Sequence, residues 1–252
     1  MSLSETSPKD LERIVAQRKS AERFLSVVLP TRISDEYDSL PQAHEWVLSG
    51  NGLLIISNHF SLRDGPQVFA AIPAKDDVMR QRTWTSPVAQ HQYPITRLID
   101  SALHTHLQIR PVVTPDAHRK HPEMRLGQGL REYVMTATET LHDGGILVLF
   151  PQAERQPHLG TADENTMSMS LLINRTTKSE VNDFFVLPIG FGIQGIEDYS
   201  KVHGANIGKT FDVSIGRLWA KSEMINDATN SGISLDAWAF SKLRQLVPDA
   251  YK

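Results

Sequence analysis

One histidine and one aspartate stand at a spacing that suits proton-transfer chemistry. His59 comes three positions after the apolar run of residues 53–56, and four residues separate it from Asp64. An imidazole can act as a general base near neutral pH. A carboxylate at its second ring nitrogen would fix the tautomer and stabilise the imidazolium that forms. Such a pair brings no nucleophile of its own, so we expect a hydroxyl of the substrate to make the attack.

The same spacing also has a purely structural interpretation. A histidine and an aspartate five positions apart often occur together by chance. Asp64 could simply cap the helix that we expect to follow. The pair alone therefore does not identify an active site, and the decision depends on the rest of the chain.

Further segments resemble the signatures of the glycerolipid acyltransferases, the family of glycerol-3-phosphate and lysophospholipid acyltransferases. The Asn-His and Asp of the pair resemble the first signature, and later segments resemble the others in the expected order. Each lies at or directly after the end of a predicted strand, and together they span about two thirds of the chain. In chain order the segments are residues 58–64, 109–112 (Ile-Arg-Pro-Val), 149–155 (Leu-Phe-Pro-Gln-Ala-Glu-Arg), 186–190 (Val-Leu-Pro-Ile-Gly) and 213–216 (Val-Ser-Ile-Gly).

The resemblance implies direct acyl transfer, with no metal and no prosthetic group. His59, oriented by Asp64, would take the proton of an acceptor hydroxyl, and the oxygen would attack the thioester of acyl-CoA or an acyl carrier protein. The acceptor would be a glycerol-phosphate or lysophospholipid-like alcohol, whose phosphate Arg110 and Arg155 would bind through their guanidinium groups. The other expected substrate-binding residues are Asn58, Phe150, Pro151, Gln152, Glu154 and Pro188.

The third segment departs from the Phe-Pro-Glu-Gly-Thr-Arg that is usual in the family. Gln152, Ala153 and Glu154 stand where the family has Glu, Gly and Thr. Gln152 can donate and accept hydrogen bonds but carries no charge, and Ala153 adopts positive φ less readily than glycine. Glu154 could supply a displaced carboxylate or could pair with Arg155. These changes leave the identity of the acceptor open more than they affect the chemistry.

Two alternatives to an acyltransferase stay open. A thioesterase-like hydrolase would use the same base to activate water instead of an alcohol. A protein that binds lipid or acyl carrier protein without catalysis would keep the fold, and Gln152 and Glu154 favour this interpretation. The complete group of Asn58, His59 and Asp64 argues against it.

Buried strands that alternate with helices must position these residues. We expect strands at residues 53–57, 83–86, 107–113, 146–150, 184–190 and 211–215, and helices at 7–29, 41–48, 65–71, 95–103, 123–142, 166–177 and 234–246. The alternation predicts an α/β fold with a mixed, largely parallel central sheet flanked by helices on both faces. The expected division is an N-terminal helical cap or hairpin over residues 1–50 and an α/β acyltransferase domain over residues 51–252.

The composition of the chain narrows the range of its partners. The 252 residues include no cysteine, which excludes a disulfide, a thiol nucleophile and cysteine-ligated zinc. The formal net charge of -3 argues against binding to nucleic acid. No apolar run is long enough to cross a bilayer and none suggests a secretory signal, so we expect a cytoplasmic protein. Contact of the first 50 residues with a membrane surface stays an alternative to simple packing on the core.

Overall fold

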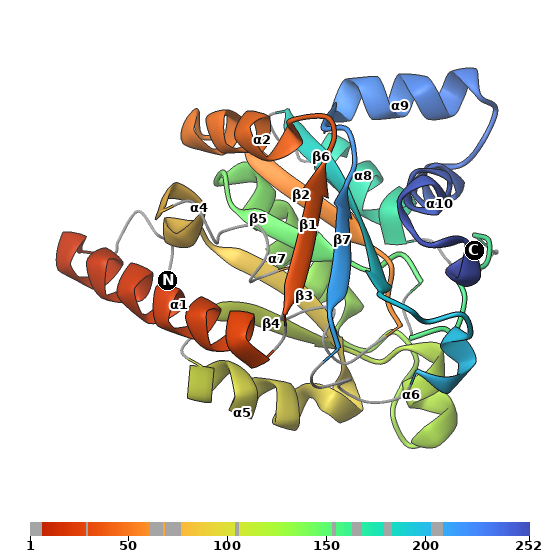
Figure 1. Cartoon of the computed structure of the whole chain (residues 1–252), viewed down its shortest axis with the longest axis horizontal. Helices are drawn as coiled ribbons and strands as arrows, with labels where there is room; N and C mark the ends of the chain where they lie inside the picture. Colours follow the sequence, from red (N-terminus) through yellow and green to blue (C-terminus); the bar gives the residue numbers. More distant parts are fainter. Residues whose placement is uncertain are drawn as a thin grey trace.

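A mixed sheet of eight strands forms the centre of the described part of the chain (Figure 1). The computed structural model describes residues 7–28, 30–60, 68, 77–103, 106–152, 155–162, 168–178, 183–202 and 209–252. In spatial order the strands are β1 (Thr31–Asp35), β7 (Phe211–Ile215), β6 (Phe184–Ile193), β2 (Gly52–Ser57), β5 (Ile146–Leu149), β3 (Trp84–Ala89) and β4 (Leu107–Val112), with β8 (Trp219–Ala220) paired to β6.

Most of the strand pairs are parallel, as the sequence predicted. β2 pairs in parallel with β5 on one side and β6 on the other, and β3 pairs in parallel with β5 and β4. β1 is parallel to β7, whereas β7 and β8 run antiparallel to β6. β2 and β5 are buried at every position, which accounts for their continuous apolar sequences.

Helices cover both faces of the sheet. Two neighbouring residues of β3 show this directly, because successive side chains of a strand point to opposite faces. Trp84 donates its indole N–H to Met79 of α4 at 3.0 Å, and the hydroxyl of Thr85 lies 2.7 Å from that of Thr140 in α7. The face with α7 (Leu130–His142) also carries α8 (Ser168–Lys178), α9 (Lys221–Asn230) and α10 (Leu235–Leu246). The face with α4 (Asp77–Gln81) also carries α1 (Pro8–Val28), α2 (Ser39–Leu48) and α5 (Tyr93–Leu103).

Some elements differ from the sequence-based expectation. The segment of β1 lies within the predicted helical region but forms a strand on β7, and neither α9 nor β8 was expected. α7 begins at Leu130, not near residue 123, because the chain turns through Gly127 and Gly129 at φ values of 75° and 80°. A Cβ at Gly129 would lie 2.2 Å from the carbonyl oxygen of Pro111, so the approach to β4 requires a glycine there. The helix predicted at residues 65–71 lies almost entirely outside the described residues.

The short remaining elements connect these layers. They are the helix α6 (Pro115–Lys120) and the 3₁₀ turns η3 (Gln90–Gln92), η4 (Tyr199–Lys201) and η5 (Asp249–Tyr251). Ser234 caps the start of α10: its hydroxyl accepts a hydrogen bond from the backbone N–H of Ala237 at 3.1 Å. Among the described residues, no helix is both long enough and apolar enough to cross a membrane.

Buried charges hold α1 against the sheet. The guanidinium of Arg18 donates to the carbonyl oxygens of Arg80, Arg82 (2.8 Å) and His106 (3.0 Å). Burial lowers the pKa of Arg18 to about 10, which still leaves it charged at neutral pH. One turn further along α1, Glu22 forms a buried ion pair with Arg80 at 2.6 Å. Three carbonyl groups and one ion pair therefore attach α1 to α4 and to the loops at the start of β3 and β4.

We predict that Glu22→Ala lowers the free energy of unfolding by roughly 3 kcal/mol, because it leaves Arg80 buried with only Asp77 as a carboxylate partner. Lys19→Ala is the matched control, since its 2.7 Å pair with Asp77 is exposed to solvent and should contribute at most about 1 kcal/mol. Urea unfolding of both variants would measure the two values. Equal losses would contradict the role given to the buried pair.

Candidate active site

Parallel pairing brings the ends of β2 and β5 to the same edge of the sheet. Ile56 of β2 is opposite Leu149 of β5, so the residues that follow each strand leave the sheet side by side. Asn58 and His59 follow β2, and the segment from Phe150 to Gln152 follows β5. This carboxyl edge is where open α/β sheets commonly bind their ligands.

The loop after β5 forms hydrogen bonds with both the backbone N–H and the backbone carbonyl of His59. The backbone N–H of His59 donates to Oε1 of Gln152 at 2.7 Å, and the carbonyl oxygen of His59 accepts from the backbone N–H of Gln156 at 2.9 Å. The half-buried imidazole stacks on Phe150, with ring centroids 4.6 Å apart and planes inclined by 29°. The structure therefore brings His59, Phe150 and Gln152 together.

Gln152 uses both ends of its amide within the protein. Oε1 accepts from His59, while Nε2 donates to the carbonyl oxygen of His158 and to the hydroxyl of Tyr251, each at 3.1 Å. A carboxylate can accept but cannot donate. A glutamate at this position would bring its second oxygen against the carbonyl of His158. The surroundings of this side chain therefore account for a glutamine, and not a glutamate, at this position.

Asn58 anchors the end of β2 to the longer strand β6. Its side chain is fully buried, and its Nδ2 donates to the carbonyl oxygen of Phe191 at 3.0 Å. The backbone N–H of Phe191 donates to Oδ1 of Asn58 at 2.7 Å. The amide thus continues the strand pairing by one step after β2 has ended. Both ends of this side chain are occupied by the protein, which gives Asn58 a role in positioning His59.

The two arginines expected at a phosphate lie apart from each other. Nε of Arg110 donates to the hydroxyl of Thr136 on α7 at 3.2 Å. β4 is three strands away from β2, a separation of about 14 Å across the sheet. The structure therefore does not place Arg110 in contact with His59. Arg155 is exposed and belongs to the same loop as Gln152.

The remaining predicted site residues fall into two groups. Pro151 and Pro188 are buried, and Pro188 lies within the sheet opposite Ile56. Asp64 and Glu154 lie outside the described residues. The orientation of His59 by the Asp64 carboxylate therefore stays a prediction.

Sequence reasoning missed an aromatic cluster behind His59. Phe60 packs against Tyr199, Tyr251 and Phe211 with centroid separations of 5.1, 5.2 and 5.7 Å. The Tyr251 hydroxyl also lies 3.3 Å from the carbonyl oxygen of His59, as a potential donor. Tyr251 is 192 positions away from His59 along the chain, and no sequence pattern connects them.

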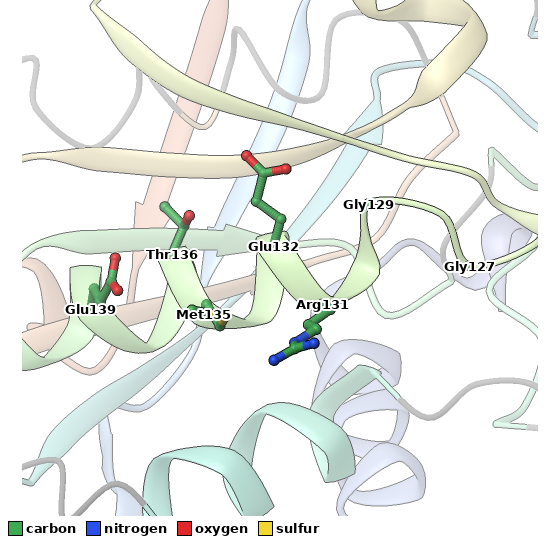
Figure 2. A pocket seen from close by; sticks show the side chains of 7 residues that line it. All are labelled: Gly127, Gly129, Arg131, Glu132, Met135, Thr136 and Glu139. Carbon is green, nitrogen blue, oxygen red and sulfur yellow. The ribbon is translucent and has the colours of Figure 1, made fainter.

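A shallow groove of about 390 Å³ lies on the Arg110 side of α7. Its lining residues are Gly127, Gly129, Arg131, Glu132, Met135, Thr136 and Glu139. Figure 2 shows Glu132 and Thr136 pointing to one side of α7 and Arg131 pointing to the other. His59 does not line this groove. Within the described ranges, no three His, Asp or Glu side chains are close enough to hold a metal ion.

Comparison with known proteins gives a similarity of fold. No protein-family model and no curated protein sequence matches this chain. The fold is similar to the crystal structure of the 1-acyl-sn-glycerophosphate (LPA) acyltransferase, PlsC, from Thermotoga maritima. The TM-score is 0.45 and the identity 16%, over 88% of this chain and 76% of that one. At these values the similarity supports no argument about activity or substrate.

We predict that Gln152→Glu destabilises the protein by about 0.5–1.5 kcal/mol, because it removes the donor to His158 and to Tyr251 and brings a carboxylate oxygen against the carbonyl of His158. Gln156→Glu makes the same chemical change four positions later, at a residue that contacts His59 through its backbone N–H. Thermal unfolding should separate the two variants. If they unfold at the same temperature, the donating role of the Gln152 amide is wrong.

Proposed function

We propose that this chain is an O-acyltransferase that moves a fatty-acyl group from a thioester to an alcohol. The observation that carries the proposal is the position of His59. Its backbone N–H and carbonyl are both held by the loop after β5, so its ring has a defined orientation at the carboxyl edge of the sheet. A general base needs such positioning before its chemistry can be efficient.

The proposed reaction needs only the protein's own groups and two substrates. The imidazole of His59 takes the proton of the acceptor hydroxyl as its oxygen attacks the thioester carbonyl carbon. The tetrahedral oxyanion then collapses, the C–S bond breaks, and the imidazolium returns the proton to the thiolate. Asp64 would orient the ring. Backbone N–H groups of the turn after Phe150 are the proposed donors to the oxyanion.

Two substrate classes follow from this chemistry. The donor is acyl-CoA or an acyl carrier protein, and the acceptor is a glycerol-phosphate or lysophospholipid-like alcohol. Arg155 supports phosphate binding better than Arg110 does, because it is exposed in the loop that holds His59. Arg110 lies three strands away and donates to Thr136.

A lipid acceptor would be met at a membrane surface through α1 and α5. These helices contact each other and lie side by side in Figure 1. They expose apolar side chains one turn apart, beside the exposed cations Arg23 and Arg97. The apolar residues are Phe24 and Val27 on α1 and Ile95, Leu98 and Ile99 on α5. Apolar side chains with neighbouring cations favour an interface that contains anionic lipid.

We predict that His59→Ala lowers the rate of acyl transfer by about 10²–10⁴-fold, the usual contribution of a general base. The assay follows thiol release from acyl-CoA in the presence of a panel of alcohols, with analysis of the acylated product. His142→Ala is the control, because this exposed histidine lies at the opposite end of α7 from the carboxyl edge.

Three results would count against the acyltransferase proposal. Full activity of His59→Ala would rule out His59 as the general base. Release of free fatty acid at the same rate without an alcohol would indicate a hydrolase. Binding of acyl-CoA by the wild type without turnover of any alcohol would indicate a protein that binds the donor without catalysis.

We predict that Leu98→Asp lowers binding to vesicles of anionic phospholipid by about tenfold or more, because it replaces an apolar contact with a charge. Leu98 is 70% exposed, so the fold should tolerate the change. Leu126→Asp is the matched control, at a leucine that is 54% exposed in the loop before α7. Co-sedimentation with vesicles measures both variants, and equal binding would exclude α5 from the membrane contact.

A further inference from the structure

The hydroxyl of Tyr133 is buried without a hydrogen-bond partner. Tyr133 lies in the first turn of α7, and its side chain is 5% exposed within the hydrophobic core. Of the buried side-chain polar atoms in the described residues, its Oη is the one with no partner. Buried polar groups are nearly always paired because desolvation without a hydrogen bond is costly. An unpaired hydroxyl therefore needs a reason at this position.

Two contacts of α7 with the sheet show where the residues of this helix lie relative to the carboxyl edge. Thr140 contacts Thr85 of β3, and Thr136, one turn earlier, contacts Arg110 of β4. Thr85 pairs with Gln108, so Arg110 lies two residues further along the strands. Four helical residues span about 6 Å, and two strand residues span about 6.6 Å. α7 therefore runs antiparallel to the strands, with its N-terminus toward the carboxyl edge of the sheet. The distance between the two contacts is about the same along the helix as along the strands.

Tyr133 lies beyond the level of Arg110, at the edge itself. It precedes Thr136 by three residues, a further distance of about 4.5 Å. Arg110 pairs with Pro87, and Leu149 pairs with Ile56. The last pair between β3 and β5 is Thr85 with Leu147, and extending this register by two residues places Pro87 level with Leu149. The backbone of Tyr133 is thus level with the residues that leave β5 and β2.

The side chain of Tyr133 extends from the helix toward the carboxyl edge of the sheet. Tyr133, Thr136 and Thr140 lie at helical spacing on one stripe of α7, and the two threonines face the sheet. Helical side chains lean toward the N-terminus of their helix, which for α7 is the carboxyl edge. Strand alternation turns Phe150 to the other face, where His59 stacks on it. A group lying across the strand ends would have His59 on one side and the Tyr133 hydroxyl on the other.

We propose that the hydroxyl of Tyr133 donates a hydrogen bond to the carbonyl oxygen of the bound acyl thioester. This inference deepens the acyltransferase proposal and rests on it. It makes Tyr133 a substrate-binding residue that none of the sequence motifs contains.

The surroundings of the Tyr133 hydroxyl favour an uncharged hydrogen-bond acceptor. Burial raises the pKa of Tyr133, so the hydroxyl stays protonated and can donate. An anionic acceptor such as phosphate would have to lose its hydration in an apolar core, at high cost. A carbonyl oxygen accepts a hydrogen bond without bringing a net charge. The thioester carbonyl is the neutral acceptor that must lie near His59 if the proposed reaction takes place.

The test compares two ligands that differ at the carbonyl group. Palmitoyl-CoA carries it, whereas hexadecyl-CoA is a thioether with the same chain length and no carbonyl oxygen. Binding is measured by calorimetry without an acceptor alcohol, for the wild type and for Tyr133→Phe. We expect the wild type to bind palmitoyl-CoA about tenfold more tightly than the thioether, the value of one net hydrogen bond. Tyr133→Phe should lose most of this preference and keep only what the backbone N–H groups of the turn after Phe150 contribute.

Stability supplies an independent readout. Without ligand, Tyr133→Phe should unfold at the same or a higher temperature, because it removes a hydroxyl that has lost its hydration without gaining a partner. Thr140→Val is the matched control on the same helix. It removes a hydroxyl that is paired with Thr85, so it should lower the unfolding temperature and keep the preference for the carbonyl ligand.

Each contrary outcome identifies what has failed. If the wild type binds neither ligand, the acyltransferase proposal with acyl-CoA as the donor fails, and this inference fails with it. If the wild type prefers palmitoyl-CoA and Tyr133→Phe keeps the same preference, only the role of Tyr133 is overturned. A lower unfolding temperature for Tyr133→Phe without ligand would also overturn it, because the hydroxyl would then have a partner in the free protein.

Discussion

The parallel pairing of β2 with β5 is the constraint on which the candidate site depends. It brings two strand ends to one edge, so a histidine after one strand meets a glutamine and a phenylalanine after the other. β6 supports the same edge from the other side, because it continues past the end of β2 and pairs with the side chain of Asn58. A shift in register of either pair would separate these groups.

Hydrogen bonds of fixed direction then determine where the backbone of His59 lies. The N–H of His59 donates to the amide oxygen of Gln152, and the amide nitrogen of Gln152 donates to the carbonyl of His158, so a single side chain joins the two segments. Tyr251, in the C-terminal segment, adds to this network because its hydroxyl is within hydrogen-bond distance of the Gln152 amide and of the carbonyl oxygen of His59. Gln152 is therefore part of a local network that a carboxylate could not complete.

The N-terminal region is connected to the sheet more closely than its sequence indicated. β1 adds a strand beside β7, and Arg18 and Glu22 attach α1 through buried polar contacts. The proposed division at residues 50 and 51 stays a prediction. An amphipathic pattern indicates that a helix packs on something, but the partner here is a set of carbonyl groups that become available only once β3 and β4 are in place.

The local pattern of residues along the chain determined much of this fold. Continuous apolar runs predicted β2 and β5, and the pattern of residues 234–246 predicted α10. Contacts that depend on the order of strands in space were beyond the sequence. The turn of Arg110 toward Thr136, the approach of Tyr251 to His59 and the unpaired hydroxyl of Tyr133 are of this kind. Periodicity encodes which face of an element is buried, whereas only the assembled sheet decides which buried groups find a partner.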